Sequence, residues 1–516
     1  MVAITNFNNI GKGMSNGHKY DESEQKQPQN TWREIEIVGN SRNLSPVLWT
    51  FTHLTGLYLR DNGISRIPAE ISRLRNLTKL DLSKNKIRSL PNEIGDMIEL
   101  NDLDLSYNSL RVLPNELGRL FRLKNLGLQG NPLPSEIMSL QLDKLLTLML
   151  DNLTVCPRPP SRQWIPITQN TTKNGNFTVM SYNVLCDKYA TRQIYGYCPQ
   201  WAMAWEYRKN AILKEILQFN ADILALQEVE TEQFWNFFLP ELKKNGYEGI
   251  FNAKSRAKTM SEEERRYVDG CAVFWHTSKF ALLKEHLVEF SQLAAAHAEG
   301  ADDMVNRVMQ RDNIGVMALL EMVDAVPELD NTKPKVVVTN AHIHWDPQFK
   351  DVKVIQTVML LRELKTFLDE SIPGAKTTPF IICADMNSMV DSGVIEFVEN
   401  SKIPMSHPDF QKLQYNGFLS KCSEKEKRGS DIVTHPFKLS RTGKDNELPF
   451  TNFTYDFTGV LDYIFYTNEE LLPLGELGPV DVEYLKKNKV LGFPHPHFPS
   501  DHICLVVEFD LKLPLR

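Results

Sequence analysis

Cysteines, basic blocks and long apolar runs are all scarce in this sequence, and each absence excludes a class of protein. Seven cysteines occur among 516 residues and none forms a C-x-x-C pair, which argues against a disulfide scaffold and is typical of a reduced intracellular protein. No apolar run approaches the ~20 residues of a membrane span, and the N-terminus lacks the apolar core of a signal peptide. We therefore expect no membrane contact and a cytoplasmic location, with the nucleus as a second location.

The charge balance excludes an extended electrostatic nucleic-acid binder. The formal net charge is −7 and no long Lys/Arg block occurs, so a large phosphate-neutralising surface is not expected. A nuclease that grips only a few nucleotides is compatible with this charge. The length of 516 residues exceeds that of one ordinary domain and predicts two or three domains.

An internal repeat with a period of 23 residues occupies the N-terminal part of the chain. The stretches "LTGLYLRDN", "LTKLDLSKN", "LNDLDLSYN" and "LKNLGLQGN" begin at Leu54, Leu77, Leu100 and Leu123. They follow the leucine-rich pattern L-x-x-L-x-L-x-x-N, in which alternating leucines of a short strand face inward and stack on the next repeat. The asparagine that closes each unit can bond backbone groups where the chain turns. These asparagines are Asn62, Asn85, Asn108 and Asn131.

The repeat predicts a small solenoid over residues 31–150. A degenerate unit around Ile35 is expected to cap the array. The concave strand face of such a solenoid usually binds a protein, and a purely structural spacer is the alternative. The polar residues 1–30 predict a disordered segment, and the Pro-rich residues 151–175 predict a linker.

Residues 176–516 have a different texture and predict a layered α/β domain. Short apolar or alternating runs such as "FTVMSYNVL", "KVVVTNAHIHW" and "PFIICADMN" are typical of strands. Amphipathic stretches at 207–218 and 351–370 predict helices between them. Roughly eight such strands with intervening helices indicate a mixed two-sheet α/β sandwich.

Polar side chains of this domain gather where the predicted strands end or begin. Because the end of one strand lies beside the start of an antiparallel neighbour, we expect these side chains to converge on one edge. Taken singly, each has a structural alternative as a turn former, a surface charge or a buried imidazole. The residues are Asn183, Glu228, His342, Asp385, Asn387, Asp462 and His502.

The residue types at this edge indicate a site for a hard cation. Carboxylate and amide oxygens without a cysteine cluster suit Mg²⁺ or Mn²⁺ rather than Zn²⁺. A carboxylate can act as a base or orient a water, and a histidine beside an aspartate, as in "PSDHICL", can stabilise a phosphate as a fixed donor. Together these groups predict metal-assisted hydrolysis of a phosphodiester.

Six motifs in this order carry a resemblance to a known superfamily: "SYNVL", "LQEVE", "NAHIHWDP", "CADMNS", "LDYIF" and "SDHICL". Residues 176–511 resemble the endonuclease–exonuclease–phosphatase superfamily. With the leucine-rich array and the stretch "THPFKLSRTGKDNELPFTNFTYDFTGVLDYIF", residues 35–515 resemble the carbon-catabolite-repressor-type deadenylases. The resemblance implies a Mg²⁺-dependent 3′→5′ exoribonuclease that shortens mRNA poly(A) tails and releases 5′-AMP.

The resemblance implies roles for two pairs of residues. Glu228 resembles the main metal-binding carboxylate, and Asn183 resembles a residue that contacts a second metal or the phosphate. Asp385 resembles the residue that orients or activates the attacking water, and Asn387 the neighbour that holds a phosphate oxygen. Since Asp385 and Asn387 are two residues apart, they are expected on the same side of the extended chain.

Further roles follow from the same resemblance. His502 would stabilise the pentavalent phosphate, and Asp501 would fix the tautomer of that ring. Asp462 would support the metal–phosphate cluster. His342 resembles the second histidine on the phosphate side of the site.

A base pocket is also implied by the resemblance. In relatives, adenine sits between an aromatic ring and a proline, and Phe457 and Pro347 occupy the matching places. The resemblance also implies that Asn387 and His342 bind the substrate. The alternative for Phe457 is an ordinary core side chain.

The implied partners are poly(A) RNA and, through the leucine-rich array, a second deadenylase that bridges the chain to the Not scaffold. Two other hypotheses stay open. One is another phosphodiesterase or phosphatase of the same superfamily, acting on a small nucleotide, an inositol phosphate or a lipid head group. The other is an interaction protein whose nuclease fold is inert.

Overall fold

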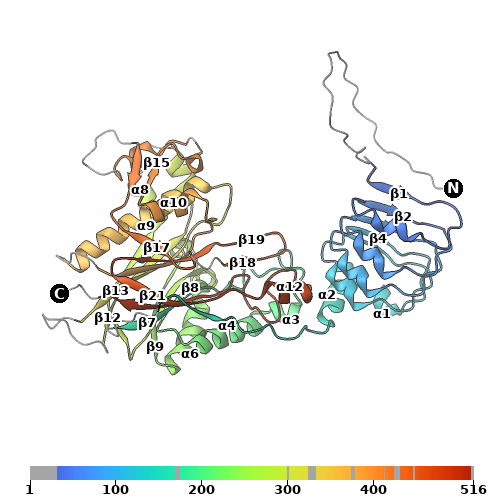
Figure 1. The fold of residues 1–516 in the computed structure, drawn as a ribbon, viewed down its shortest axis with the longest axis horizontal. Helices are drawn as coiled ribbons and strands as arrows, with labels where there is room; N and C mark the ends of the chain where they lie inside the picture. The colour runs from blue at the N-terminus through green and yellow to red at the C-terminus, as the bar shows by residue number, and fades with distance from the viewer. Residues whose placement is uncertain are drawn as a thin grey trace, which may run out of the picture. The chain divides into compact units, whose positions relative to one another are not determined.

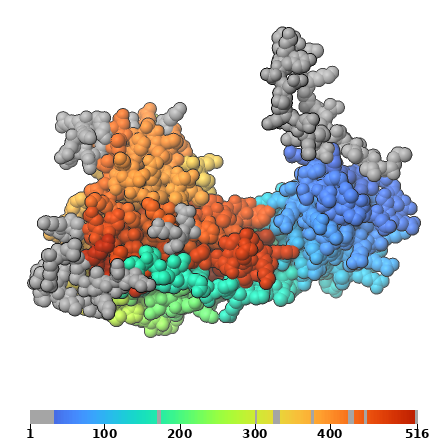
Figure 2. Space-filling model, viewed as in Figure 1, coloured from blue at the N-terminus to red at the C-terminus, as the bar shows by residue number. Residues whose placement is uncertain are grey.

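The computed structural model describes residues 32–168, 175–298, 302–323, 333–373, 378–411, 413–422, 431–444 and 448–512. The chain forms two compact units, which Figures 1 and 2 show in the same colours. The first unit is Met1–Cys156 with Gly196–Trp201, and the second is Pro157–Tyr195 with Ala202–Arg516. The segment predicted to be disordered, residues 1–30, lies outside the described residues. Within the described residues, no helix has the length and apolar character needed to cross a membrane.

The first unit is the predicted leucine-rich solenoid, built on a five-stranded parallel sheet. The strands contribute inward aliphatic side chains, and Leu57, Leu80 and Leu103 lie side by side in register and are buried. The strands are β1 (Glu34–Glu36), β2 (Gly56–Tyr58), β3 (Lys79–Asp81), β4 (Asp102–Asp104) and β5 (Asn125–Gly127). Between them lie the 3-10 helices η1 (Pro46–Thr50), η2 (Ala69–Arg73), η3 (Asn92–Asp96) and η4 (Asn115–Arg119). The degenerate first unit therefore forms strand β1.

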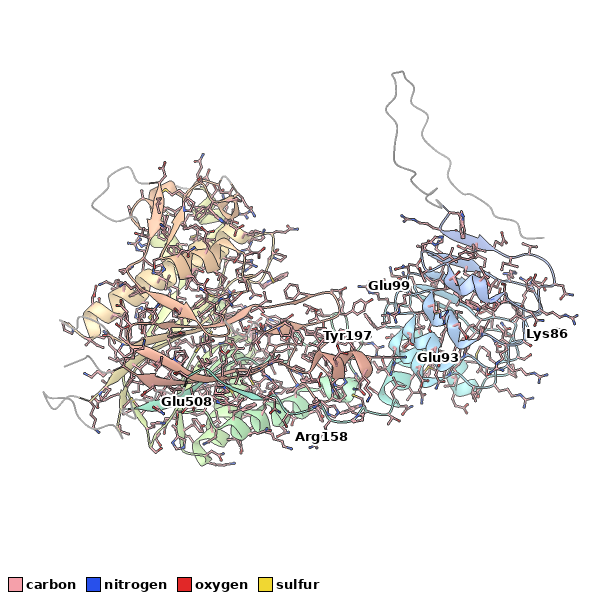
Figure 3. The ribbon with its side chains drawn as sticks, in the orientation of Figure 1. Lys86, Glu93, Glu99, Arg158, Tyr197 and Glu508 are labelled. Carbon is pink, nitrogen blue, oxygen red and sulfur yellow. The ribbon has the colours of Figure 1, made fainter. Side chains whose placement is uncertain are left out.

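The asparagine that closes each repeat joins that repeat to its neighbours. Asn85 Oδ1 accepts a hydrogen bond from the backbone N–H of Asn62 at 3.1 Å, and its Nδ2 donates to the carbonyl of Leu59 at 2.8 Å. The period also pairs surface side chains, since Arg122 donates to Glu99 of the preceding repeat at 3.0 Å. Figure 3 labels Glu99 among the side chains of this unit. The buried amide contacts confirm the predicted role of the repeated asparagines.

Two helices close the C-terminal end of the array. They are α1 (Ser135–Met138) and α2 (Leu142–Asp151), and the apolar face of α2 joins the leucine core. This helix approaches the last repeat closely. A Cβ at Gly118 would lie 2.3 Å from the backbone nitrogen of Leu150, so only glycine fits there.

The second unit contains two mixed sheets, in the orders β6-β21-β22-β7-β8-β10-β9 and β11-β12-β13-β14-β20-β17. The pairs β7–β8 and β13–β14 are parallel, and the other pairs in these two sheets are antiparallel. The seven-stranded sheet consists of β6 (Trp164–Pro166), β21 (Leu471–Leu477), β22 (Leu505–Leu511), β7 (Asn176–Asn183), β8 (Ile223–Glu230), β10 (Asp269–His276) and β9 (Tyr247–Ala253). The six-stranded sheet consists of β11 (Phe280–Glu289), β12 (Ile314–Met322), β13 (Lys335–His342), β14 (Phe380–Asp385), β20 (Asp462–Thr467) and β17 (Leu439–Arg441).

Helices cover the outer face of each sheet and an apolar core lies between the sheets, which gives four layers (Figure 1). On the seven-stranded sheet lie α4 (Trp205–Phe219) and α6 (Leu239–Lys244). On the six-stranded sheet lie α8 (Phe290–Ala296), α9 (Lys350–Ser371) and α10 (Gly393–Asn400). This architecture confirms the predicted two-sheet α/β sandwich.

Short elements fill the connections. The short helices are α3 (Gln200–Met203), α5 (Thr231–Gln233), α7 (Glu262–Arg265), α11 (Asn416–Leu419) and α12 (Val482–Lys487). The short strands pair as β15 (Lys402–Pro404) with β16 (Ile432–Thr434), and as β18 (Asn452–Phe453) with β19 (Thr458–Gly459).

Several strands of these sheets do not show the expected alternation in sequence. Strand β11 has exposed charged residues at its centre, and β21 shifts register between Pro473 and Gly475. The segment 151–175, predicted to be a linker, contains strand β6, which belongs to the seven-stranded sheet and pairs with β21. Strand β6 ends in Pro166, which is tolerated because β6 lies at the sheet edge.

Candidate active site

One edge of the two sheets carries the predicted polar residues. In the six-stranded sheet His342, Asp385 and Asp462 lie side by side in register. Strand β7 of the other sheet ends at Asn183, whose Nδ2 donates to Glu228 Oε1 at 3.1 Å and to Asp385 Oδ2 at 2.9 Å. The amide of Asn183 therefore connects the polar edges of both sheets.

Glu228 reaches this edge through a β-bulge. Val229 pairs with Gly270 and Gln227 with Cys271, so Glu228 has no opposite residue in the ladder. Its φ of +58° lies in the left-handed region, a strained conformation that is typical of functional sites. The prediction that Glu228 ends its strand is corrected, since β8 continues to Glu230 and the bulge turns the Glu228 side chain into the site.

A glycine makes the bulge possible. A Cβ at Gly270 would lie 2.0 Å from the carbonyl oxygen of Asn252, so the neighbouring strand β9 leaves no room for a side chain. Strand β10 can therefore approach β9 closely at the level of the bulge. A substitution at Gly270 would push these strands apart.

The Glu228 carboxylate is held in a largely negative environment. Its Oε2 accepts a hydrogen bond from the backbone N–H of Cys186 at 3.1 Å. Burial, with the nearby carboxylates of Asp269 and Asp501, raises the pKa of Glu228 to about 7, although Lys254 opposes the shift. A cation at this carboxylate would remove the cost of ionising it.

A buried ion cluster under Glu228 was missed by the sequence analysis. Lys254 Nζ lies 2.6 Å from Asp269 Oδ2, and Arg256 lies 2.7 Å from Asp269 Oδ1. Burial alone would raise the pKa of Asp269, but the two cations outweigh it and bring that pKa to about 2. Lys254 follows strand β9, and an isolated lysine carries no motif that could have revealed this contact.

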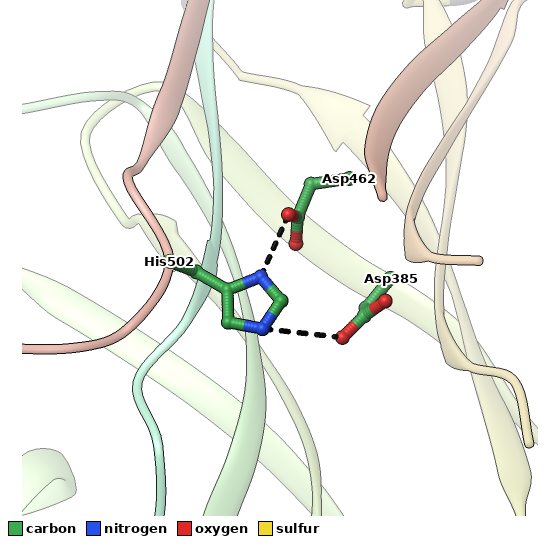
Figure 4. Close-up of side chains that lie close together, drawn as sticks. All are labelled: Asp385, Asp462 and His502. Carbon is green, nitrogen blue, oxygen red and sulfur yellow. Dashed lines mark hydrogen bonds and ion pairs between the residues drawn. The ribbon is translucent and has the colours of Figure 1, made fainter. Parts of the chain in front are cut away.

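His502 lies between two carboxylates (Figure 4). Its Nδ1 is 2.7 Å from Asp462 Oδ2, and its Nε2 is 3.8 Å from Asp385 Oδ2. Burial alone lowers the pKa of His502, but Asp462, Asp501 and Asp385 outweigh burial and hold the pKa well above its usual range. These carboxylates therefore favour the protonated, imidazolium form of the ring.

The predicted contact between Asp501 and His502 is corrected. Asp462 makes the short bond to the ring, whereas the nearest oxygen of Asp501 is 4.0 Å from His502 Nε2. Asp501 instead accepts hydrogen bonds from Tyr195 Oη at 2.8 Å and Asn452 Nδ2 at 3.1 Å. The physical reason is direction: Asp462 opens a strand that faces the ring, and Asp501 turns toward the loop containing Tyr195.

The loop that carries His502 is tied to the end of β7. Ser500 Oγ donates to the carbonyl of Asn183 at 2.7 Å. The fully buried Arg208 donates to the carbonyls of Leu185 at 2.7 Å and Pro499 at 3.3 Å. These bonds fix His502 against the amide that connects the two sheets.

His342 differs from His502 in its charge. Its Nε2 lies 3.6 Å from Asp385 Oδ2. Burial and the positive charge of Lys254 lower the pKa of His342 to about 4. Since this ring is neutral at neutral pH, it can donate or accept a hydrogen bond but supplies no charge.

The "DMN" stretch ends strand β14 in a tight turn. Asn387 has a φ of +47°, its N–H donates to Asp385 Oδ1 at 2.9 Å, and its Nδ2 donates to the carbonyl of Ile343 at 3.0 Å. Lys353 of α9 donates to the carbonyl of Asn387 at 2.6 Å. Asp385 and Asn387 line the same cavity, as predicted. The reason differs from the prediction, because a turn and not an extended strand places Asn387 there.

A single cavity of about 900 Å³ collects these groups. Glu228, Asp385 and His502 line it. Pro347 and Phe457 line it as well, and the Phe457 side chain is 38% exposed. The alternative that Phe457 is a core residue is therefore wrong.

The donor set fits a hard cation. Asp385, Asp462 and His502 offer ligand atoms within 4.8 Å of one another and could hold a metal ion. Glu228 and Asp385 form a second place for a cation, because the Asn183 amide bridges their oxygens as a positive group would. The Asn183 oxygen is used by the N–H of Leu185 at 3.0 Å, so its nitrogen faces the carboxylates. This orientation does not match the metal contact expected for Asn183.

Comparison with known proteins agrees with this site. The model of the Endonuclease/Exonuclease/phosphatase family matches residues 180–502, and a model of two leucine-rich repeats matches residues 52–94. The chain is 53% identical over 507 residues to CCR4-NOT transcription complex subunit 6-like-A of Xenopus laevis, covering 94% of this chain and 92% of that protein. It is 41% identical to the CCR4-Not complex 3′-5′-exoribonuclease subunit Ccr4 of Schizosaccharomyces pombe, covering 95% of this chain and 76% of that protein.

A solved structure resembles the second unit. The structure of ANGEL2, described as a 2′,3′-cyclic phosphatase in complex with adenosine-2′,3′-vanadate, matches with a TM-score of 0.55 and 26% identity. The match covers 69% of the present chain and 99% of the ANGEL2 chain. The fold, the clustered site and the extent of the sequence matches agree: the chain belongs to the endonuclease/exonuclease/phosphatase family and, within it, to the leucine-rich-repeat group of the Ccr4-type exoribonucleases.

Proposed function

We propose that this chain is a magnesium-dependent 3′→5′ exoribonuclease that shortens mRNA poly(A) tails and releases 5′-AMP. The observation that carries the proposal is the one cavity lined both by Glu228, Asp385 and His502 and by a partly exposed aromatic ring, Phe457. This arrangement supplies hydrolytic groups and a base platform in one place. The Ccr4 relatives named as 3′-5′-exoribonuclease subunits support the same activity.

Asp385 is the group that takes the proton of the attacking water. Burial and the adjacent Asp462 raise the pKa of Asp385, which makes it a stronger base than an ordinary aspartate. Its Oδ1 is held by the N–H of Asn387 and its Oδ2 by Asn183. These bonds fix the carboxylate toward the position of the water.

His502 stabilises the negative charge that develops on the phosphate. Asp462 holds Nδ1 of the ring, so the N–H at Nε2 points toward the cavity. A fixed, charged donor in a site that excludes water stabilises a transition state more than water does. His342, whose Nε2 lies 3.6 Å from Asp385 Oδ2, would supply a second, uncharged hydrogen bond to the phosphate.

Glu228 and Asp385 would hold Mg²⁺, with Mn²⁺ as a substitute. The ion would supply positive charge to a non-bridging phosphate oxygen and lower the pKa of a bound water. The raised pKa of Glu228 supports this assignment, because a carboxylate that is costly to ionise alone gains from a nearby cation. Asn183 Nδ2, which donates to both carboxylates, would hold them in place beside the ion.

The 3′-terminal base is stacked between Phe457 and Pro347. The ring of Phe457 rests over Gly459, where a Cβ would lie 2.8 Å from the ring edge. Thr454 fixes the turn, since its Oγ1 accepts from the N–H of Phe457 at 3.1 Å. Asn387, which also lines the cavity, offers an amide to the edge of the base.

Phe457→Ala is expected to reduce kcat/KM on A20 RNA by roughly one to two factors of ten. The reason is loss of one stacking contact, which contributes ~1–3 kcal/mol per base. The reduction should be larger on A20 than on U20, because a purine offers more stacking area. Initial rates on the two RNAs measure the difference, and Phe457→Tyr, which keeps the ring, is the matched control. Equal proportional losses on both RNAs would show that the ring is structural.

The activity itself is tested with labelled RNA. The full chain should remove residues one at a time from the 3′ end of A20, faster than from a mixed-sequence RNA of equal length, and EDTA should stop the reaction. Chromatography should identify the product as 5′-AMP. Turnover of 2′,3′-cyclic AMP without shortening of A20 would instead favour the phosphatase alternative, for which the ANGEL2 likeness speaks. No turnover of either substrate with Mg²⁺ or Mn²⁺ would favour an inert interaction protein.

The leucine-rich unit is the docking site for a second deadenylase, which joins the chain to the Not scaffold. The relatives named as CCR4-NOT subunits support membership of that complex. On the strand face, Glu36, Tyr58, Asp81 and Asp104 form one row across neighbouring strands. The row is acidic with one aromatic side chain, which suits a basic partner surface.

Charge reversal in this row tests the docking. The double variant Asp81→Lys, Asp104→Lys should lose co-purification of the second deadenylase while A20 hydrolysis by the purified chain stays within about twofold of wild type, since surface changes away from a site have small effects. Arg75→Glu, an exposed residue of the same unit outside the row, is the matched control. Deleting residues 31–150 should have the same effect on binding. Partner binding retained by residues 176–516 alone would overturn the docking proposal.

A further inference from the structure

An exposed tryptophan stands in the wall of the active-site cavity. Trp345 lines the cavity and its side chain is 68% exposed. The large apolar side chains of Ile194 and Met389 also line the cavity and are exposed. Exposed apolar groups gathered around one cavity are typical of a binding surface.

The loop that displays Trp345 is held by contacts that do not involve its indole. Lys353 Nζ donates to the carbonyl of Trp345 at 3.2 Å, and this lysine is buried at the start of α9. Asp346 Oδ1 accepts from the N–H of Gln348 at 2.8 Å, and the carbonyl of Asp346 accepts from the N–H of Phe349 at 3.1 Å. The ring is therefore displayed on a fixed backbone.

Lys353 also links this loop to the catalytic turn. Its Nζ donates to the carbonyl of Asn387 at 2.6 Å as well as to that of Trp345. One ammonium group thus sets the position of the tryptophan loop relative to the turn that holds Asp385. A ring positioned in this way can hold a second nucleotide at a fixed place relative to the reacting phosphate.

The cavity has room for more than one nucleotide. Its volume of about 900 Å³ is near the upper end of the ~300–1,000 Å³ that small-molecule pockets occupy. A base enclosed between Phe457 and Pro347 has both faces covered by protein. The next base therefore cannot stack on it, and its own faces need another partner.

We propose that Trp345 stacks the base immediately 5′ of the 3′-terminal residue, which makes the cavity a site for two nucleotides. This inference rests on the exoribonuclease activity proposed above and assigns a further specificity-determining residue to it. Lys350 also lines the cavity, and its ammonium group can meet the phosphate backbone of the second nucleotide. An indole accepts any base, and purines offer it the larger face.

Kinetics on two substrates test the proposal. Trp345→Ala in the full chain should raise KM for A6 roughly 5- to 150-fold, the range expected for the loss of one base–aromatic stack, and leave kcat within a few-fold. Hydrolysis of bis(p-nitrophenyl) phosphate, which has no second base, should be unchanged. Trp345→Phe should restore most of the affinity for A6. Trp235→Ala, a 57% exposed tryptophan that is not among the residues lining this cavity, is the matched control and should change neither substrate.

Binding without turnover gives an independent reading. In EDTA, A6 should quench tryptophan fluorescence of the wild type and of Trp235→Ala more than that of Trp345→Phe. Unchanged KM for A6 in Trp345→Ala, or equal losses on A6 and bis(p-nitrophenyl) phosphate, would overturn the proposal. Loss of a protein partner with normal RNA kinetics would assign the ring to protein binding and overturn it as well. A wild-type chain that does not shorten A20 would defeat the proposed function before any variant is compared.

Discussion

Glu228→Gln is expected to reduce kcat/KM on A20 RNA by two to four orders of magnitude. The substitution removes the negative charge that would hold the metal ion, and a metal ion contributes several kcal/mol to such a transition state, with each ~1.4 kcal/mol worth a factor of ten. Most of the loss should appear as a higher Mg²⁺ requirement, because Asp385 still offers one carboxylate to the ion. Initial rates measured against Mg²⁺ concentration separate this effect from a lower rate at saturation.

The stability of the same variant shows whether the fold survives. Burial raises the pKa of Glu228 from 4.5 to about 7, so in metal-free protein the ionised folded state is penalised above pH 7 and the unfolded state is not. Glutamine mimics the protonated form. In EDTA, Glu228→Gln should therefore have a larger free energy of unfolding than wild type at pH 8. The difference should be at most about 3 kcal/mol, because solvent reaches part of the Glu228 side chain and screens its charge. The advantage should shrink as pH falls from 7 and vanish below about pH 4.5, where both states are protonated.

Two results would contradict the assignment. Near-full activity of Glu228→Gln in millimolar Mg²⁺ would show that this carboxylate holds no essential ion. Equal thermal midpoints of variant and wild type across pH 5–8 in EDTA would show that ionising the Glu228 carboxylate does not destabilise the folded state. Glu232→Gln, a residue just beyond the end of the same strand, serves as the matched control for both measurements.

The repeat unit could be predicted in detail because its period is local. The strand leucines pair with their counterparts 23 residues away. The side-chain amides of Asn85, Asn108 and Asn131 each donate to a carbonyl 26 residues earlier, so the same contact recurs from repeat to repeat. Strands β7, β8, β13 and β14 were also evident, since buried strands carry continuous apolar runs. The edge strand β6 was not, because three residues with a proline carry no such pattern.

The geometry inside the site depends on contacts between residues of different strands, and the sequence alone does not give the register of those strands. The bulge at Glu228 needs Gly270, which stands on another strand and is compressed against a third. The resemblance implied Asp501 as the partner of the His502 ring, and the structure has Asp462 in that place. The sheet register, which brings Asp462 opposite Asp385, decides which carboxylate meets the ring.

Asp462→Asn is expected to reduce kcat/KM on A20 RNA by about 10²–10³, the cost of losing one charged transition-state donor, whereas Asp501→Asn should cost less. Burial lowers the pKa of His502, and Asp462 is the first of the carboxylates that raise it. Without that carboxylate, burial dominates and the ring becomes neutral at a lower pH. The basic limb of the kcat/KM profile should therefore move to lower pH in Asp462→Asn, and the variant should recover part of its activity as pH is lowered.

His502→Ala separates this charge effect from a loss of metal. If His502 acts as an imidazolium, adding Asp462→Asn to the His502→Ala variant should cause little further loss, since the two residues work as one unit. The Mg²⁺ concentration for half-maximal rate should stay close to wild type in both single variants. A strongly raised Mg²⁺ requirement in Asp462→Asn and in His502→Ala would instead mean that Asp385, Asp462 and His502, whose ligand atoms lie within 4.8 Å of one another, hold the ion themselves. In that case the short Nδ1–Oδ2 contact would open when the metal binds, and Glu228 would be left with a supporting role.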